Sequence, residues 1–436
     1  MPDSDRPSVP RAGETLIDAS QLRPGVYVRL PVPWAEHPFM FNAFVIADEE
    51  QARQVAALKL PQLFCDLARC KVPPLVKPAA ESPSDPAAVA EAARLATLRT
   101  RQMTEKQARA KVMAELRARL DKAQKHYVGA AKAVGSALQD FARNPEESVR
   151  QVSEVSLQST AALLADPDSA IVLIAEKAQA DGAAAHSLSV MTLSLLLGKQ
   201  ARLPEEALHT LGVAALFHDI GKLGLPATVL RNPTRNKHEE AFYQEHCRRG
   251  QQAALACGQL APAVVDAILH HHERANGSGF PDHLAGKEIQ VAARVVAIAD
   301  RFDNLTNPVD TRRAVSPSEA LSLLWTREQK FFDHALLQIF IRAMGVFPPG
   351  SIVQLSDGRV GAVVISAESE KPLCPQVMLY DPDVPRRQAI IIDLAREDGL
   401  RVDRALRLQE RPSDELDYLL PRRRLNWFHT GSGGTA

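Results

Sequence analysis

The stretch LFHDIGK, residues 216–222, places a histidine and an aspartate side by side at the end of an apolar helical run. A second stretch, HHHERANGSGF at residues 270–280, opens with three consecutive histidines. Because only 13 of the 436 residues are histidine, such a run has a chance probability of roughly 1 in 100. Burying several ionisable groups in a helical core requires a compensating charge, which a cation supplies. The two stretches therefore predict a metal-binding core built from helices.

Asp219 is the residue around which the metal site is predicted. A neighbouring imidazole and carboxylate suit a divalent metal such as Fe, Mn or Zn, and one carboxylate can bridge two ions about 3.5–4 Å apart. Taken alone, His186 and His246 are more typical of ordinary core or surface histidines, and Asp300 is either a ligand or a carboxylate paired within its helix. The candidate ligands on helical segments, besides Asp219, are five histidines and one further aspartate: His186, His218, His246, His271, His272 and Asp300.

Changes of pattern along the chain predict five regions. Alternating apolar and polar residues with Pro-Gly breaks indicate a small α/β regulatory domain over residues 1–70, followed by a Pro- and Ser-rich linker at 71–89. Strong helix formers predict a long helical segment at 90–145, and helical patterns broken by Pro and Gly predict an all-α domain at 146–345. Short runs such as VGAVVIS then predict a small β-rich region at 346–436 with a disordered tail.

The composition excludes several classes of protein. The 52 basic and 52 acidic side chains cancel, so no bulk charge attracts a nucleic acid polymer. The five cysteines form no C-x-x-C pair, as expected where thiols stay reduced. No apolar stretch reaches the roughly 18 residues of a membrane span, and the first residues lack the apolar region of a signal peptide. We therefore expect a cytoplasmic protein without a membrane span.

The sequence resembles the HD-GYP family, a branch of the HD metal-dependent phosphohydrolases of bacterial signalling. The N-terminal segment looks like a domain of unknown function often found before HD-GYP domains. The resemblance runs through His186-Ser187, AALFHDIGKLGLPATVL at 214–230, Glu239, His246 and Gly250, HHERANGSGFPDHLAGKEI at 271–289, AARVVAIADRFDNLT at 292–306 and FFDHALLQIFIRAMGVFPPGSIVQLSDG at 331–358.

This resemblance implies both an activity and a site. Family members hydrolyse cyclic di-GMP to linear pGpG or GMP, with iron or manganese ions and through a metal-bridging hydroxide. Carried over to this chain, the resemblance implies that all seven candidate residues above are metal ligands, that Asp219 is the catalytic bridge, and that Lys222 lies near the scissile phosphate. A phosphodiester needs a strong nucleophile and neutralised phosphoryl oxygens, and a hydroxide, two cations and a lysine meet both needs.

Two departures from the family pattern concern the signature and the number of metals. The GYP signature reads Gly279-Phe280-Pro281, which keeps an aromatic face for substrate binding but loses a hydroxyl. Members of the family with a third metal have a glutamate where this chain has Gly182. We therefore expect two divalent ions, iron or manganese, rather than three.

A third departure concerns the binding of substrate phosphate. Residues 307–312 read NPVDTR, so that Val309 replaces a basic residue of the family. Arg312 and Arg313 remain as the expected phosphate contacts, together with Lys222.

These departures leave two alternatives open. One is a weakly active or inactive module that senses a cyclic dinucleotide or binds a signalling protein, and the other is a hydrolase of another nucleotide. Homodimer formation through residues 86–142 also stays open, because their apolar seam is irregular over the heptads that a coiled coil requires.

Overall fold

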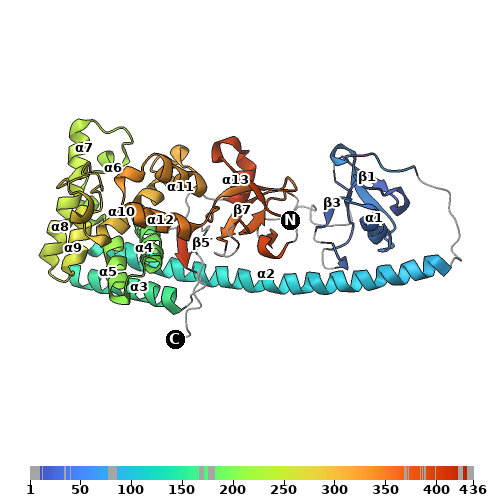
Figure 1. Cartoon of the computed structure of the whole chain (residues 1–436), viewed down its shortest axis with the longest axis horizontal. Coiled ribbons are helices and arrows are strands. Elements are labelled where there is room, and N and C mark those ends of the chain that lie inside the picture. The colour runs from blue at the N-terminus through green and yellow to red at the C-terminus, as the bar shows by residue number, and fades with distance from the viewer. Residues whose placement is uncertain are drawn as a thin grey trace. The chain divides into compact units, whose positions relative to one another are not determined.

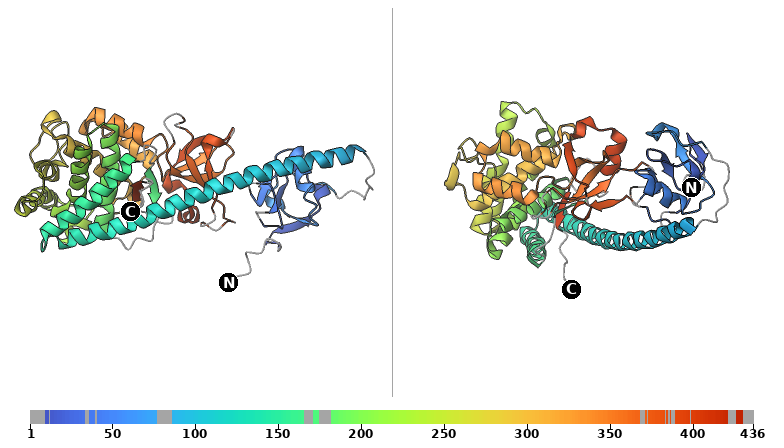
Figure 2. Two further views of the ribbon diagram at one scale, coloured as in Figure 1. Left: turned by 90° about the horizontal axis from the view of Figure 1, so that it is seen from below. Right: turned by 45° about the vertical axis from the view of Figure 1, so that its right-hand side comes forward.

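A computed structural model of this chain describes residues 10–11, 13–33, 36–39, 41–76, 86–165, 171–174, 182–367, 371, 373–382, 384, 386, 389–397, 399–420 and 426–429. The chain divides into two units, Met1–Leu116 and Arg117–Ala436, and Figures 1 and 2 show the elements of both. No helix in the described ranges has both the length and the apolar character that crossing a lipid bilayer requires.

The first unit contains an antiparallel four-stranded sheet and one short helix, α1 (Glu49–Ala56). That helix begins after Asp48, whose side chain accepts a hydrogen bond from the backbone N–H of Gln51. It buries Ala52 and Val55 in the core beneath the sheet. The strands, in the order β1-β4-β2-β3, are β1 (Glu14–Ile17), β2 (Tyr27–Arg29), β3 (Ala43–Val45) and β4 (Leu63–Asp66), with 3-10 turns η2 (Ala19–Gln21) and η4 (Leu67–Arg69). The predicted α/β region is confirmed.

The helix α2 (Pro86–Asp140) runs unbroken for 55 residues. Its Ala, Arg, Lys, Glu and Leu residues are strong helix formers. It begins inside the stretch that the sequence analysis assigns to a linker, because proline suits the first turn of a helix, where its missing N–H is not needed. Residues 77–85 of the expected linker, like the expected tail at 431–436, lie outside the described residues.

Helices make up most of the second unit (Figure 1). They are α3 (Pro145–Ala165), α4 (Gly182–Gln200), α5 (Glu205–Phe217), α6 (Ala227–Arg231), α7 (Lys237–Gln244), α8 (His246–Cys257), α9 (Pro262–His270), α10 (Val291–Thr306), α11 (Pro317–Thr326) and α12 (His334–Met344). Between them lie the 3-10 turns η5 (Ile220–Gly224), η6 (Gly286–Glu288), η7 (Thr311–Arg313) and η8 (Gln329–Phe331).

The helix α4 forms the centre of this helical region. From Ala184 to Gly198 every residue except His186 is buried, and α5, α10 and α12 all pack against the helix. A helix that is buried on all sides is typical of a core element. His186 is therefore the one ionisable side chain that α4 brings into the interior of the domain over these residues.

The second unit also contains a seven-stranded antiparallel sheet, whose strands after residue 346 are orange to red in Figure 1. Six strands, β11 included, come from the predicted β-rich region at 346–436, and β5 is the seventh. The path is β10-β6-β7-β5-β11, and β8 joins β7 to β9. The strands are β5 (Ile171–Ile174), β6 (Ile352–Leu355), β7 (Val360–Ile365), β8 (Gln376–Leu379), β9 (Ile391–Asp393), β10 (Val402–Leu406) and β11 (Asn426–His429), accompanied by η10 (Leu394–Arg396), η11 (Leu408–Glu410) and α13 (Ser413–Leu419).

The strand β5 differs from the sequence analysis, which expects only helices between residues 146 and 345. It pairs with β11 along its whole length and with β7 at Val172 and Ile365. A four-residue apolar run such as IVLI is too short to show a period, so its pattern cannot separate a strand from a buried helical turn. Pairing with β7 and β11, which lie far away in the sequence, makes this run a strand.

Candidate metal centre

The motif HDIGK places its two candidate ligands at the point where α5 ends. His218 is the last residue with helical backbone angles, and Asp219 leaves the helix before the η5 turn. Both side chains then lie at the inner end of a helix whose last seven residues are buried. The change from helix to tight turn thus brings an imidazole and a carboxylate to one point.

Gly221 brings this turn into direct contact with the backbone of α8. A Cβ at Gly221 would lie 2.0 Å from the carbonyl oxygen of His246 and 2.6 Å from the backbone nitrogen of Gly250. Only glycine fits there, because no side-chain atom can approach a backbone this closely. The contact fixes Asp219 beside His246, the first residue of α8.

One carboxylate oxygen of Asp219, Oδ2, faces the first group of candidate ligands. It lies 3.4 Å from Nε2 of His218 and 3.7 Å from Nε2 of His186. Asp300 of α10 completes this group, with its Oδ1 3.1 Å from Nε2 of His186 and 3.6 Å from Nε2 of His218. Three helix ends or helices, α4, α5 and α10, therefore direct their donor atoms to one volume.

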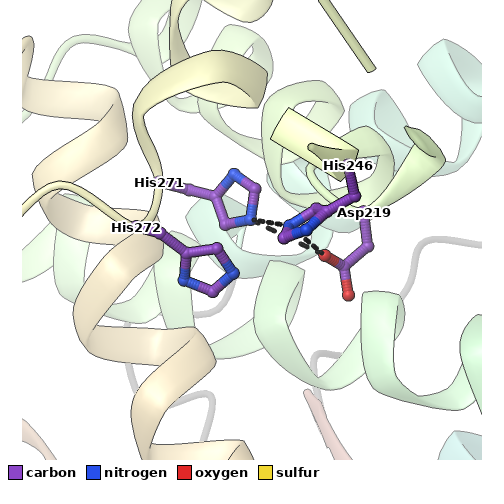
Figure 3. Close-up of side chains that lie close together, drawn as sticks. All are labelled: Asp219, His246, His271 and His272. Atoms are coloured by element: carbon purple, nitrogen blue, oxygen red, sulfur yellow. Dashed lines mark hydrogen bonds and ion pairs between the residues drawn. The ribbon is translucent and has the colours of Figure 1, made fainter. Parts of the chain in front are cut away.

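The other oxygen of Asp219, Oδ1, faces a second group. It lies 3.6 Å from Nε2 of His246 and 3.6 Å from Nε2 of His271. These two nitrogens are 3.4 Å apart, and His272 lies beside them, with its ring centroid 4.1 Å from that of His271 (Figure 3). The ligand atoms of Asp219, His246, His271 and His272 all lie within 4.8 Å of one another.

Each of four histidines is oriented by a hydrogen bond from its outer nitrogen. A histidine that donates its Nδ1–H in this way keeps its Nε2 lone pair for a metal. The donations run from His218 to the carbonyl of Ala215 at 2.7 Å, from His246 to Tyr243 at 2.6 Å, from His271 to Ile268 at 2.9 Å, and from His186 to Oδ2 of Asp303 at 2.7 Å. All four Nε2 atoms consequently point toward the centre.

Two buried polar atoms in the centre suit a cation. Asp219 Oδ1 and His272 Nε2 are shielded from solvent and have no hydrogen-bond partner within the described part of the chain. An unsatisfied buried polar atom is costly unless a ligand or ion completes it. Imidazole nitrogens combined with carboxylate oxygens form a donor set that fits first-row divalent metals. The residues that are present therefore fit the metals expected from the sequence.

The electrostatics of the centre also favour a cation. Burial lowers the pKa of His246 to about 3 and lowers the pKa values of His271 and His272, so these rings are neutral and can bind metal. Burial opposes protonation of His218 as well, but the Asp219 and Asp300 carboxylates outweigh it and raise its pKa to about 10. The carboxylates thus demand positive charge in the first group of ligands.

The two donor groups open on a cavity of about 970 Å³. Lys222 lines it and donates from Nζ to Oδ2 of Asp219 at 2.5 Å, and the carboxylate keeps the pKa of this lysine raised despite burial. Phe280 also lines the cavity, with its ring centroid 4.8 Å from that of His272. Val309, which is 69 % exposed, lines the same cavity.

The remaining expected substrate contacts differ in position. Arg313 lines the cavity, whereas Arg312 does not: its side chain is 84 % exposed and pairs with Asp310. Gly279 and Pro281 are also absent from the cavity lining. Gly279 instead packs on the backbone, where a Cβ would lie 2.4 Å from the nitrogen of Arg274.

Residues next to the candidate ligands have roles that the sequence left open or missed. His270 lies outside both donor groups and contacts the carboxylates of Asp266 and Asp282. Glu273 accepts a hydrogen bond from the backbone N–H of Asp282 at 2.6 Å. Asp303, which orients His186, was missed, although its position one helical turn after Asp300 places both on one face of α10.

Comparisons with known proteins give two family matches. Residues 161–336 match the HD domain, and residues 14–152 match the domain of unknown function DUF3391. HD domain proteins are metal-dependent, and the histidine and aspartate cluster described above could bind metal.

Several curated relatives are similar to this chain, among them the following three. The cyclic di-GMP phosphodiesterase PA4108 of Pseudomonas aeruginosa is 27 % identical over 400 residues, which cover 87 % of this chain and 89 % of the relative. The cyclic di-GMP phosphodiesterase response regulator RpfG of Xanthomonas campestris is 35 % identical over 34 % of this chain and 39 % of its own length. The 3'3'-cGAMP-specific phosphodiesterase 1 of Vibrio cholerae is 34 % identical over 32 % of each chain.

Proposed function

We propose that this chain, which belongs to the HD-GYP family of HD-domain phosphohydrolases, hydrolyses cyclic di-GMP in a metal-dependent reaction. The observation that carries the proposal is the position of Asp219: its two carboxylate oxygens face two separate groups of histidines. One carboxylate that lies between two groups of metal-binding side chains is the arrangement that a two-metal hydrolase requires. The relative PA4108, similar along most of its length, carries the name of a cyclic di-GMP phosphodiesterase.

Two divalent ions, iron or manganese, would occupy the two groups. His186, His218 and Asp300 would hold one ion, and His246, His271 and His272 the other, with Asp219 shared between them. Imidazole and carboxylate donors suit both metals. When bound, the ions would supply a strong nucleophile from water at neutral pH and neutralise charge on the phosphoryl oxygens.

Lys222 and Asp219 have distinct tasks in this proposal. The raised pKa of Lys222 keeps its ammonium charged, and its position in the cavity lining allows it to neutralise a non-bridging phosphate oxygen in the transition state. The hydrogen bond from Lys222 to Oδ2 holds the Asp219 carboxylate in one orientation. The leaving group would be the ribose 3′ oxygen, which gives pGpG and, after a second cleavage, GMP.

The cavity is large enough for a nucleotide and has basic side chains in its lining. Ligand sites typically occupy about 300–1,000 Å³, and this cavity of about 970 Å³ lies at the upper end of that range. Lys222 and Arg313 in its lining attract phosphates, and Tyr243 and Phe280 offer aromatic faces. We further propose that the N-terminal α/β domain regulates the reaction through a signalling partner or through dimerisation along α2.

The proposal is tested by elemental analysis and a cyclic di-GMP cleavage assay on the same anaerobically purified protein. We expect about two equivalents of iron or manganese and formation of pGpG. Two equivalents of metal with cyclic di-GMP binding but no cleavage would favour the sensor alternative. Cleavage of 3'3'-cGAMP alone would favour another nucleotide, and absence of metal would refute the site.

Matched variants separate ligands from neighbours. Asp219→Ala and His271→Ala should each lower the metal content and abolish cleavage, because each removes a donor that faces the centre. His270→Ala is the control, since His270 is adjacent in sequence and buried but lies outside both donor groups. Equal metal content in His271→Ala and His270→Ala would contradict the ligand assignment.

A further inference from the structure

One wall of the cavity carries a set of side chains that the metal chemistry does not use. Glu328 and Arg301 form a bidentate ion pair there, with Nε–Oε2 and Nη2–Oε1 distances of 2.8 and 2.6 Å. Beside this pair, the guanidinium carbon of Arg274 lies 4.4 Å from the centre of the Phe331 ring. We call these four residues, Arg274, Arg301, Glu328 and Phe331, the purine wall.

Exposure argues that the ion pair does more than stabilise the fold. The Arg301 side chain is 43 % exposed and that of Glu328 is 20 % exposed. Exposed ion pairs of this kind contribute little to stability, yet both side chains face a cavity that an incoming ligand would fill. The pair is therefore available to a ligand while its two members hold each other in a fixed orientation.

The chemistry of the purine wall matches guanine. A carboxylate accepts hydrogen bonds at about four lone-pair positions, and the pairing with Arg301 uses only part of this capacity. Guanine presents N1–H and N2–H donors on one edge and the O6 and N7 acceptors that arginine binds. Nη1 of Arg301 has no partner within the described ranges. Adenine would instead direct its N1 lone pair at the carboxylate, which repels it.

The flat groups of the wall provide the stacking surface. Bases stack on phenylalanine rings and on arginine planes with little regard to sequence. Phe331 and Arg274 present both kinds of surface in one contact. Stacking would supply binding, and the ion pair would supply the choice of base.

The wall is fixed to the metal centre on two sides. Arg301 directly follows the candidate ligand Asp300 on α10. On the other side, the backbone N–H of Ala275 donates to the carbonyl of Phe331 at 2.8 Å, which ties η8 to the loop that follows His272. A base held on the wall would therefore keep a constant distance from the reacting phosphate.

We propose that the purine wall is a guanine-recognition subsite, in which Glu328 and Arg301 select guanine over adenine in the cyclic dinucleotide. This inference rests on the proposed function, since it assigns the base specificity of that same site.

The test compares substrates that contain and lack a base. Rates are measured for cyclic di-GMP, cyclic di-AMP and bis(p-nitrophenyl) phosphate, which reports on the metal centre alone. In Glu328→Gln, the cyclic di-GMP rate divided by the bis(p-nitrophenyl) phosphate rate should fall at least tenfold, the effect of about one lost charged hydrogen bond. The preference for cyclic di-GMP over cyclic di-AMP should shrink with it.

Asp333→Asn is the matched control. Asp333 pairs with Arg294 of α10 at 2.6 Å, so it ties α10 to the connection between α11 and α12, as Glu328 does. Unlike Glu328 and Arg301, Asp333 and Arg294 do not line the cavity. Asparagine also preserves the N-cap that Asp333 provides for α12. The rate ratio in this variant should match that of the unmodified protein.

A measurement on the unmodified protein keeps the test decisive if Glu328→Gln does not fold. GMP should inhibit bis(p-nitrophenyl) phosphate hydrolysis at least tenfold more strongly than AMP does. Equal inhibition by the two nucleotides, or an unchanged rate ratio in Glu328→Gln, would overturn the inference and leave the proposed function intact. Selective inhibition by GMP without any cleavage of cyclic di-GMP would refute the proposed function and support the guanine subsite.

Discussion

Gly221→Ala should separate the two halves of the metal centre without removing a ligand. The new Cβ would lie 2.0 Å from the carbonyl oxygen of His246, whereas ordinary contacts begin at 3.4 Å, so η5 and α8 must move apart by the difference, about 1.4 Å. Functional groups must hold their positions to within about 0.5 Å. The two oxygens of Asp219 can then no longer lie beside His218 and His246 at the same time.

The expected magnitude follows from the atoms that would clash. Overpacking costs about 1–3 kcal/mol, and the atoms nearest to Gly221 are backbone atoms that cannot swing aside. We therefore expect a loss of about 3 kcal/mol in the free energy of unfolding. Because ligand geometry is disturbed, metal affinity should fall by at least the roughly 10–100-fold that the loss of an orienting partner causes.

The assay combines calorimetric unfolding, with and without a chelator, with metal analysis and cyclic di-GMP cleavage. Gly224→Ala is the matched control in the same turn, since its Cβ would meet only Arg249 Nη1, at 3.9 Å. The control should remain within about 0.5 kcal/mol of the unmodified protein. Full metal loading and normal cleavage in Gly221→Ala would refute the reasoning that this backbone contact sets the ligand positions.

Three further predictions concern an orienting carboxylate, pH and substrate phosphate. Asp303→Asn should weaken metal binding roughly 10–100-fold, because His186 loses its charged acceptor. Competition with a chelator measures the metal affinity, and an unaltered affinity would contradict the orienting role of Asp303. Although burial opposes it, nearby carboxylates raise the pKa of His218 to about 10, so its proton stabilises the metal-free fold fully below about pH 6.5 and ceases to do so as pH rises through 10. The melting temperature of chelator-treated protein should therefore fall from pH 7 to 10, and a flat profile would argue against this. Arg313→Ala should raise KM for cyclic di-GMP about tenfold, whereas Arg312→Ala should leave KM unchanged, because Arg312 lies outside the cavity lining. Steady-state kinetics measure both KM values, and equal effects of the two substitutions would contradict the assignment of Arg313 as the phosphate contact.

The helical core could be predicted because its signals are local. Proline and glycine breaks divide residues 146–345 into segments, and LFHDIGK carries its ligand types in adjacent positions. Which oxygen of Asp219 faces which histidines could not be predicted, since it depends on how α4, α8 and α10 meet. The close contact at Gly221 could not be predicted either, because its partner in α8 lies more than twenty residues away in the sequence.

The sequence alone does not distinguish the roles of adjacent residues of the same type. Arg312 and Arg313 are equivalent as residue types and both pair with Asp310, and only the course of η7 brings Arg313 and not Arg312 into the cavity lining. The purine wall was missed for a related reason. Glu328 and Arg301 are 27 residues apart, and an isolated Arg or Glu on a helical segment indicates nothing more than a solvated surface.

The pairing of β5 with the C-terminal sheet bears on how this protein can be divided. β5 lies in the connection between α3 and α4, and β11 both pairs with β5 and packs against α4, the helix that carries His186. A chain cut after residue 345 would leave β5 with unpaired backbone groups, the kind of edge that promotes aggregation. The catalytic region is therefore not a detachable module, and a chimaera that transplants it has to carry residues 171–174 and 426–429 together.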